Sequence, residues 1–367
     1  MKNPSSLLNK IEKRKQEGLF RELTLFSSGV DFYSNDYLGF SKIIDNYKLN
    51  HDLGSGSTGS RLISGNSKQA LETEKLVADF FDAETALLFN SGYDANIGLL
   101  SAIGGRNDVF LMDELCHASM YDGCRLSFSK TYKFRHNDVQ HLKQLVEKNK
   151  TADTIYILLE SVYSMDGDCA PIDEMVESID EKNVYFILDE AHATGVVGNY
   201  GKGLVSALNL ENKIYARIHT FGKAMGCHGA CVLGSKELVN YLINFARSFI
   251  YTTALPPSSL SAIQSSIEEL RRTDQILILN TKINFFREQV KNMEKWIPSS
   301  SAVQSFIYKG NDKVDRVSKI CKENNFLVKA IKSPTVAKNQ ERVRICLHSF
   351  NTFEEIKQLV DIIKTLN

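Results

Sequence analysis

Short apolar runs alternate with longer amphipathic stretches between about residues 84 and 234, and this alternation permits few architectures. It is typical of parallel strands that are joined by helices. Several runs are apolar at nearly every position, as expected for strands that are covered on both faces. We therefore predict an α/β fold with a mostly parallel, doubly wound sheet flanked by helices. The predicted strands are 86–89, 109–112, 131–134, 155–159, 184–188, 217–219 and 230–233.

The pattern changes after Pro256-Pro257. Long helical stretches follow, and then strand-like runs at 302–307, 326–331 and 343–347. The segment Thr352-Phe-Glu-Glu355 is a capping box that opens a final amphipathic helix. We expect an N-terminal segment at 1–45, a large domain at 46–250 and a smaller C-terminal α+β domain at 251–367.

Charge and apolar content exclude several classes of protein. The 44 basic and 44 acidic residues cancel, so no overall field would recruit nucleic acid or an anionic membrane. The chain lacks a run of about 18 apolar residues, and its N-terminus lacks the apolar core of a signal peptide, so we expect a cytoplasmic location. The seven cysteines are dispersed, which favours reduced thiols. Cys227 and Cys231 flank His228, but further ligands at a metal-site spacing are missing nearby, and we expect no metal.

Two motifs that directly follow predicted strands carry a carboxylate and an amine. Asp189 begins the motif Asp-Glu-Ala-His after the strand 184–188, and Lys223 ends the motif Thr-Phe-Gly-Lys after the strand 217–219. Ligands of open α/β sheets bind at the carboxyl ends of the strands. Alone, Asp189 could cap a turn and Lys223 could be solvated. Together they supply what a pyridine cofactor needs, a carboxylate for its ring nitrogen and an amine for its aldehyde.

Groups that would hold a phosphate and a ring lie upstream. The segment Ser91-Gly-Tyr93 follows the strand 86–89 and opens a helix, where free amides and the helix dipole favour an anion. His117 follows the strand 109–112, and its imidazole could lie on the cofactor ring. Each feature by itself is also compatible with an ordinary strand-to-helix turn or a structural histidine.

The glycine-rich run from Gly54 to Gly59 matches the dinucleotide pattern G-x-G-x-x-G. It follows Asn50-His-Asp-Leu53, which is not a buried strand, so the structural context of that pattern is missing. We therefore discount nicotinamide binding.

Nine segments, in order along nearly the whole chain, carry a resemblance to a known family. They are Ser34-Asn-Asp-Tyr-Leu-Gly39, the glycine-rich run extended to Gly65, Asn90-Ser-Gly-Tyr93, His117-Ala-Ser119, His136-Asn-Asp138, Ser164-Met-Asp-Gly-Asp168, Asp189-Glu-Ala-His192, Thr220-Phe-Gly-Lys223 and Ile250-Tyr-Thr-Thr253. In these segments the chain resembles the α-oxoamine synthases, fold-type I transferases that depend on pyridoxal 5'-phosphate.

The resemblance implies a role for each residue around the cofactor ring. Lys223 would hold the cofactor as a Schiff base and act in proton transfer. Asp189 would pair with the ring nitrogen and His192 would contact the ring oxygen. His117 would stack on the ring, with Ser164 beside it.

The resemblance also implies how the phosphate and the substrates are held. The phosphate ligands would be Ser91, Gly92, Tyr93 and Thr220, joined by Thr252 and Thr253 of the neighbouring subunit in a homodimer. Arg344 would clamp the carboxylate of the amino acid, and Arg21 would lie at the entrance for the acyl substrate. Lys332 stands where several relatives have an arginine, and we assign it no substrate contact.

The resemblance implies a decarboxylative condensation of an amino acid with an acyl thioester. Local agreement at 134–139 and 165–171 favours L-alanine with pimeloyl-CoA or a pimeloyl carrier protein, a step of biotin biosynthesis. Sister enzymes that use glycine with a short acyl-CoA, or serine with palmitoyl-CoA, stay open because fold and cofactor do not choose between them. A pyridoxal-phosphate lyase or aminotransferase, and a relative without turnover, are the further alternatives.

Overall fold

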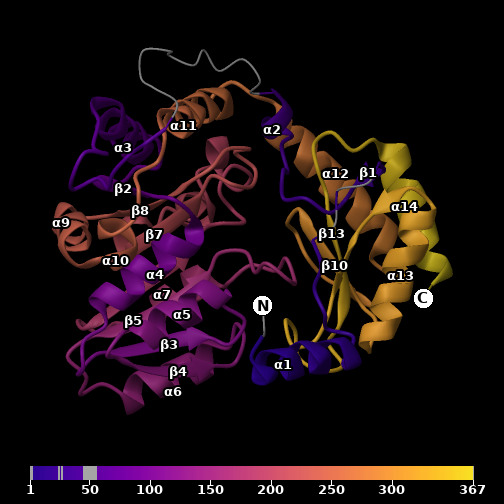
Figure 1. Cartoon of the computed structure of the whole chain (residues 1–367), viewed down its shortest axis with the longest axis horizontal. Coiled ribbons are helices and arrows are strands. Elements are labelled where there is room, and N and C mark those ends of the chain that lie inside the picture. The colour runs from indigo at the N-terminus through magenta and orange to yellow at the C-terminus, as the bar shows by residue number, and fades with distance from the viewer. Residues whose placement is uncertain (1–2, 24, 26–27, 44–55, 367) are drawn as a thin grey trace. The chain divides into compact units, whose positions relative to one another are not determined.

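The computed structural model describes residues 3–23, 25, 28–43 and 56–366, and divides into two compact units (Figure 1). The first unit comprises Met1–Ser34, Met165–Gly167 and Asn280–Asn367, and the second comprises Asn35–Ser164 and Asp168–Leu279. None of the helices in the described ranges is both long enough and apolar enough to cross a membrane.

The second unit is built on a seven-stranded sheet with the order β2-β8-β7-β6-β5-β3-β4. Its strands are β2 (Thr85–Phe89), β3 (Val109–Asp113), β4 (Lys130–Phe134), β5 (Ile155–Glu160), β6 (Val184–Asp189), β7 (Ile214–Thr220) and β8 (Ala230–Gly234). Neighbouring strands from β7 to β4 are parallel, whereas β8 runs antiparallel to both β7 and β2. The predicted strands and the mostly parallel sheet are therefore confirmed.

The helices of this unit connect and cover the strands. They are α2 (Phe40–Ile43), α3 (Lys68–Phe80), α4 (Gly92–Ile103), α5 (Ala118–Leu126), α6 (Val139–Lys148), α7 (Ile172–Glu177), α8 (Leu204–Ala207), α9 (Lys236–Phe245), α10 (Arg247–Ile250) and α11 (Pro257–Leu270), with the 3-10 turns η2 (Asn199–Gly201) and η3 (Glu211–Lys213). Helix α12 (Gln275–Val290) contains the boundary between the units.

Two apolar clusters, one on each face, hold the seven-stranded sheet. Phe110 and Met112 of β3 face the cluster that includes α4, α5 and α9, whereas Leu111 between them faces the cluster with α6, α7 and α8. Because side chains alternate along a strand, a run that is apolar at every position supplies both clusters. The continuous apolar runs of the sequence thus predict a sheet buried on both sides.

The first unit contains a smaller antiparallel sheet with the order β12-β13-β10-β9 and a two-stranded pair, β1-β11. Its elements are α1 (Ser5–Gln16), β1 (Val30–Asp31), β9 (Trp296–Ile297), β10 (Val303–Ile307), α13 (Asn311–Glu323), β11 (Phe326–Leu327), β12 (Lys329–Ile331), β13 (Arg342–Cys346) and α14 (Phe353–Thr365). The predicted strand 326–331 is divided between the two sheets. The predicted capping box at Thr352 and Glu355 is present.

The two compact units meet in the sequence at 34/35, 164/165, 167/168 and 279/280. The expected boundary at 45/46 lies outside the described residues. Helix α11, which follows the expected boundary at 250/251, packs on α3 of the second unit, where Gln69 Nε2 donates to Ser261 Oγ at 2.8 Å. The N-terminal segment groups with the C-terminal residues because β1 pairs with β11.

The loop Ser161–Ala170, here named the serine loop, begins and ends in the second unit. The three residues at its tip, Met165–Gly167, group with the first unit. There Ser299 Oγ donates to the Gly167 carbonyl at 2.8 Å. Gly167 has a φ of +76°, and a Cβ at this position would overlap the carbonyl oxygen of Val303. Only glycine fits both constraints.

Replacing Gly167 with alanine should therefore destabilise the protein by about 2–4 kcal/mol, from left-handed backbone strain plus overpacking. Gly18→Ala is the matched control, because Gly18 has a φ of +65° and nothing within 4 Å of its missing Cβ. The control should lose about 1 kcal/mol. Urea unfolding measures both, and equal losses for the two variants would contradict the steric argument.

Candidate active site

Four polar residues end neighbouring strands of the large sheet. Asp113, Glu160, Asp189 and Thr220 are the last residues of β3, β5, β6 and β7, which run parallel. The carboxyl ends of parallel strands meet at one edge of a sheet, where open α/β folds bind ligands. Glu160 and Asp189 are direct partners in the register of β5 and β6. The candidate site is therefore built at this edge.

A chain of hydrogen bonds joins Asp189 to His117. Asn96 Nδ2, on α4, donates to Asp189 Oδ2 at 2.7 Å and to Ser119 Oγ at 3.0 Å. Ser119 Oγ lies 2.8 Å from His117 Nδ1. Because the hydroxyl accepts from Asn96, it can donate to His117, whose Nδ1 then acts as an acceptor. The backbone N–H of Ala191 reaches the other Asp189 oxygen at 2.9 Å.

The imidazole of His117 is exposed although its Nδ1 is anchored. Partial removal from water lowers the pKa of His117, while the neighbouring charges of Asp189 and Lys223 raise and lower it respectively. An anchored, neutral ring with an accessible face is the arrangement that stacking on a flat cofactor requires.

His192, the last residue of the motif that begins at Asp189, is held in place by the hydroxyl of Tyr37. It is 5% exposed, and its Nδ1 lies 2.7 Å from the hydroxyl of Tyr37, which also contacts Asn35 Oδ1 at 3.2 Å. Tyr37 is itself 1% exposed. The segment 34–39 therefore orients His192.

Lys223 lies in the connection between β7 and β8, where backbone hydrogen bonds form both before and after the lysine. Phe221 N donates to the Gly229 carbonyl at 2.9 Å, and Gly226 N donates to the Lys223 carbonyl at 2.9 Å. The charge of Lys223 lowers the pKa of His117 and of Glu160. Its amine therefore shares one electrostatic site with these side chains and Asp189.

Glu160 is a buried carboxyl that was not predicted as a site residue. Burial raises the pKa of Glu160 to about 8, helped by the charge of Asp189 and opposed by Lys223 and by the backbone N–H groups of His117 and Ser164. Those two N–H groups bond to the Glu160 carboxyl. It thus ties together the two residues expected around the cofactor ring.

The residues predicted to hold a phosphate, called the phosphate cup, lie together at the start of α4. A Cβ on Gly92 would lie 3.4 Å from Thr220 Cβ, so these two residues lie in close contact. Gly92 and Tyr93 are the first two residues of the helix, whose N–H groups have no intrahelical acceptor. Ser91 Oγ caps the helix by accepting from Asp94 N at 3.1 Å. The Tyr93 hydroxyl donates to Asp122 at 2.5 Å, which raises the pKa of Tyr93.

Thr252 and Thr253 lie beside this cup within the same chain. Asn90 Nδ2 donates to Thr252 Oγ1 at 2.9 Å and to the Thr253 carbonyl at 3.0 Å. In the glycine-rich loop, Gly54 and Ser55 lie outside the described residues. Just behind that loop, Arg61 forms a two-pronged ion pair with Glu74 at 2.8 and 2.9 Å.

The two arginines predicted for substrates belong to the first unit. Arg344 is buried on β13, opposite Ser305 of β10 and Lys329 of β12. Arg21 is exposed and lines a groove of about 1050 Å³ within that unit. Lys332 pairs with Asp315 at 2.5 Å.

Three residues that hold the site together, namely Glu160, Asn96 and Tyr37, were not predicted from the sequence. A carboxylate that ends an otherwise apolar strand was the available signal for Glu160. Tyr37 stands within the segment 34–39 and Asn96 follows the segment 90–93, and only the fold brings them to His192 and Asp189.

The chain is similar to known proteins over most of its length. Residues 27–363 match the aminotransferase class I and II family. An 8-amino-7-oxononanoate synthase from Emericella nidulans is 42% identical, over 98% of this chain and 95% of the relative. The structure of an 8-amino-7-oxononanoate synthase from Francisella tularensis has a TM-score of 0.80 and 30% identity, covering 92% of this chain and 97% of the other.

A more distant likeness supports the fold alone. A variant of serine palmitoyltransferase from S. paucimobilis, solved with a pyridoxal phosphate–myriocin aldimine, has a TM-score of 0.89 at 24% identity, covering 99% of this chain and 96% of the other.

The fold and the site define a fold-type I transferase, and the chain belongs to the aminotransferase class I and II family as a pyridoxal-phosphate-dependent α-oxoamine synthase. The family, the fold and the enzyme class expected from the sequence are confirmed.

Glu160→Gln should flatten the dependence of stability on pH in the cofactor-free protein. The pKa of Glu160 is about 8 in the folded chain against an ordinary value of 4.5, so folding takes up a proton between these values and wild-type stability falls as the pH rises through that window. The slope can approach 1.4 kcal/mol per pH unit. Urea unfolding at pH 5.5 and 8 measures the difference, with Glu177→Gln, on the exposed surface of α7, as control. Parallel curves for wild type and Glu160→Gln would contradict the assignment.

Proposed function

We propose that this enzyme condenses L-alanine with a pimeloyl thioester, releasing carbon dioxide and free thiol, to form 8-amino-7-oxononanoate. The observation that carries the proposal is the cluster of Asp189, Lys223 and His117 at the strand ends, in a chain 42% identical to an enzyme of that activity. The pimeloyl group is supplied as pimeloyl-CoA or on a carrier protein.

The residues at the strand ends fit pyridoxal phosphate. Asp189 is buried and keeps acceptor capacity beyond its bonds to Asn96 and Ala191, as a ring N–H requires. The buried atoms Glu160 Oε1 and Asn96 Oδ1 have no hydrogen-bond partner among the described residues. Unsatisfied polar atoms at one buried edge are typical of a site that a polar group completes.

Each residue then has a distinct task. Pyridoxal phosphate, when bound, supplies an electron sink for the charge that develops at the amino acid Cα. Asp189 stabilises a proton on the ring nitrogen, and His192, held by Tyr37, donates to or accepts from the ring oxygen. Lys223 Nζ anchors the cofactor and moves the Cα proton. His117 supports the ring face, with Ser164 beside it.

The remaining contacts bind the charged ends of the reactants. The helix start at Gly92 and Tyr93, together with Ser91 and Thr220, holds the phosphate through N–H and O–H donors. Arg344 binds the amino-acid carboxylate, for which its planar fork is suited, and Arg21 serves the acyl substrate.

Release of free thiol from pimeloyl-CoA with L-alanine tests the function. This pair should give a higher kcat/KM than glycine with acetyl-CoA or serine with palmitoyl-CoA. Lys223→Ala should reduce turnover roughly a thousandfold, because it removes the anchor and the proton-transfer amine. Lys236→Ala, at the exposed start of α9, is the matched control and should retain activity. Borohydride should fix the cofactor on the peptide that contains Lys223. Preference for glycine with acetyl-CoA would identify a sister activity.

We further propose that the active form is a homodimer in which Thr252 and Thr253 complete the phosphate site of the partner. The support is the family resemblance and the position of both threonines beside the phosphate cup, at Asn90. Because they adjoin the cup of their own chain, a role within one subunit is the competing arrangement.

Mixing two inactive variants distinguishes these arrangements. Lys223→Ala chains combined with chains that carry both Thr252→Ala and Thr253→Ala should regain up to about a quarter of the wild-type activity if the threonines act across the interface, because one site of each hybrid dimer is then intact. If the threonines act within their own chain, hybrid dimers contain no intact site. Activity assays after proven subunit exchange, with sedimentation to establish the dimer, make the measurement.

A further inference from the structure

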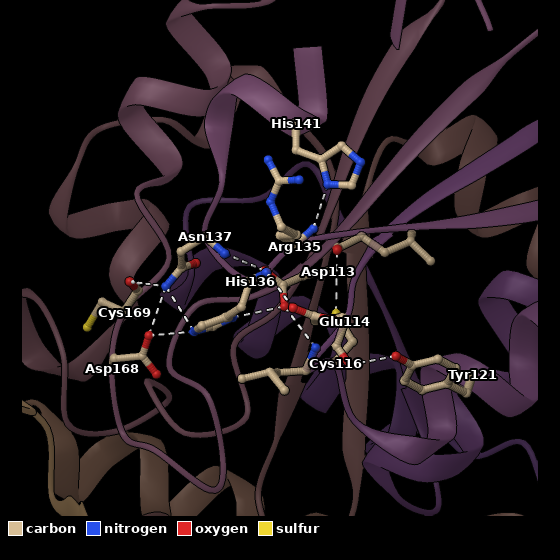
Figure 2. A network of polar contacts seen from close by, with 12 residues as sticks. Asp113, Glu114, Cys116, Tyr121, Arg135, His136, Asn137, His141, Asp168 and Cys169 are labelled. Carbon is tan, nitrogen blue, oxygen red and sulfur yellow. Dashed lines mark hydrogen bonds and ion pairs between the residues drawn. The ribbon is translucent and has the colours of Figure 1, made fainter. Parts of the chain in front are cut away.

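A second polar cluster lies next to the candidate site and has no role in the reaction described above. It consists of Asp113, His136, Asn137 and Asp168, which come from the end of β3, the turn after β4 and the serine loop (Figure 2). His136 Nδ1 lies 3.0 Å from Asp113 Oδ1, and His136 Nε2 lies 2.7 Å from Asp168 Oδ2. Figure 2 shows the imidazole between the two carboxyl groups.

The geometry determines the charge of this histidine. Carboxylate oxygens only accept, so both ring nitrogens must donate, and only the imidazolium has two N–H donors. Asn137 Nδ2 also lies 3.2 Å from Nε2, but its two hydrogens are used by Asp168 Oδ2 at 2.8 Å and the Cys169 carbonyl at 3.3 Å. Burial lowers the pKa of His136, but the bonds and charges of Asp113 and Asp168 outweigh it and raise the pKa to about 9.

Asp113, the more deeply buried of the two carboxylates, is firmly held. Asp113 is 0% exposed, and it also accepts from the backbone N–H groups of Leu115 and Asn137, each at 2.9 Å. The His136 ring packs edge-on against Tyr163, with centroids 4.4 Å apart. These contacts give the imidazolium one position relative to the large sheet.

Asp168, the second carboxylate of the cluster, belongs to the serine loop. Asp168 closes the base of this loop, because Tyr163 N donates to the Asp168 carbonyl at 2.9 Å and Val162 pairs with Cys169. Ser164 lies between these paired residues, one position after Tyr163, and is 8% exposed. A contact that fixes Asp168 therefore fixes the backbone on which Ser164 is carried.

We propose that His136 is a positioning residue that clamps the base of the serine loop to the large sheet through Asp168 and thereby sets the position of Ser164 in the active site. The consequence for turnover rests on the proposed function, whereas the order of the loop does not. The His136-Asn-Asp138 motif then contributes the clamp, the second bond to Asp168 and the cap of α6.

Deuterium exchange on the cofactor-free protein tests the clamp without activity. His136→Gln should speed exchange at least severalfold in the peptide covering the serine loop, but not in the β7–β8 hairpin. His141→Gln is the matched control, because His141 accepts from Arg135 N at 3.0 Å in the same network and makes no contact with Asp168 there. Asp168→Ala removes the acceptor of His136 Nε2 and leaves the buried Asp113–His136 pair in place, so it should reproduce the effect. This variant tests the clamp if His136→Gln does not fold.

A double-mutant cycle on the holoenzyme tests the connection to Ser164. His136→Gln should lower kcat/KM roughly tenfold to a hundredfold in the wild-type background, but less than about threefold when Ser164 is already alanine. Unchanged exchange in the serine loop, or equal losses in both backgrounds, would overturn the clamp. A wild-type enzyme that releases no thiol would instead contradict the proposed function, and the exchange experiment would still decide whether His136 orders the loop.

Discussion

The hydrogen bond from Asn96 to the buried carboxylate of Asp189 is the contact on which the site depends. A carboxylate at 5% exposure is tolerated only with donors on its oxygens, because an unpaired buried charge costs several kcal/mol. Asn96 supplies a donor without neutralising the charge, and its second hydrogen extends the bonding to Ser119 and His117. Moving Asp189 would therefore move the imidazole as well.

The strand ends show three solutions to the problem of burying a carboxyl group. Asp113 is neutralised by a charged histidine, Asp189 is solvated by amide donors, and Glu160 is held in a site that favours its protonated form. Because Glu160 and Asp189 are register partners, two full negative charges there would repel each other. The edge of the sheet thus keeps one carboxylate available for a cationic ligand.

The strands could be predicted from the sequence, and physical reasons explain what could not be predicted. Continuous apolar runs identify buried strands, but they carry no information on direction, so the antiparallel orientation of β8 could not be predicted. Asp189 and Lys223 stand out because each follows a strand in an unusual motif. Asn96 does not, since its partners are 23 and 93 residues away and only the packing of α4 brings them together.

The antiparallel β8 has a consequence for the lysine. Had the chain crossed over to a parallel strand, Lys223 would begin a long connection, whereas here it lies in a short one closed by Phe221 and Gly229. Other segments also contact this connection. A Cβ on Gly226 would overlap the backbone of Ser41, and Ser266 Oγ donates to the Met225 carbonyl at 2.7 Å. These contacts hold the backbone at Lys223 in place. Movement of the Lys223 amine must therefore come from rotation about the bonds of its four methylene groups. The length of the side chain, and not movement of the loop, then limits the distance over which the amine can transfer a proton.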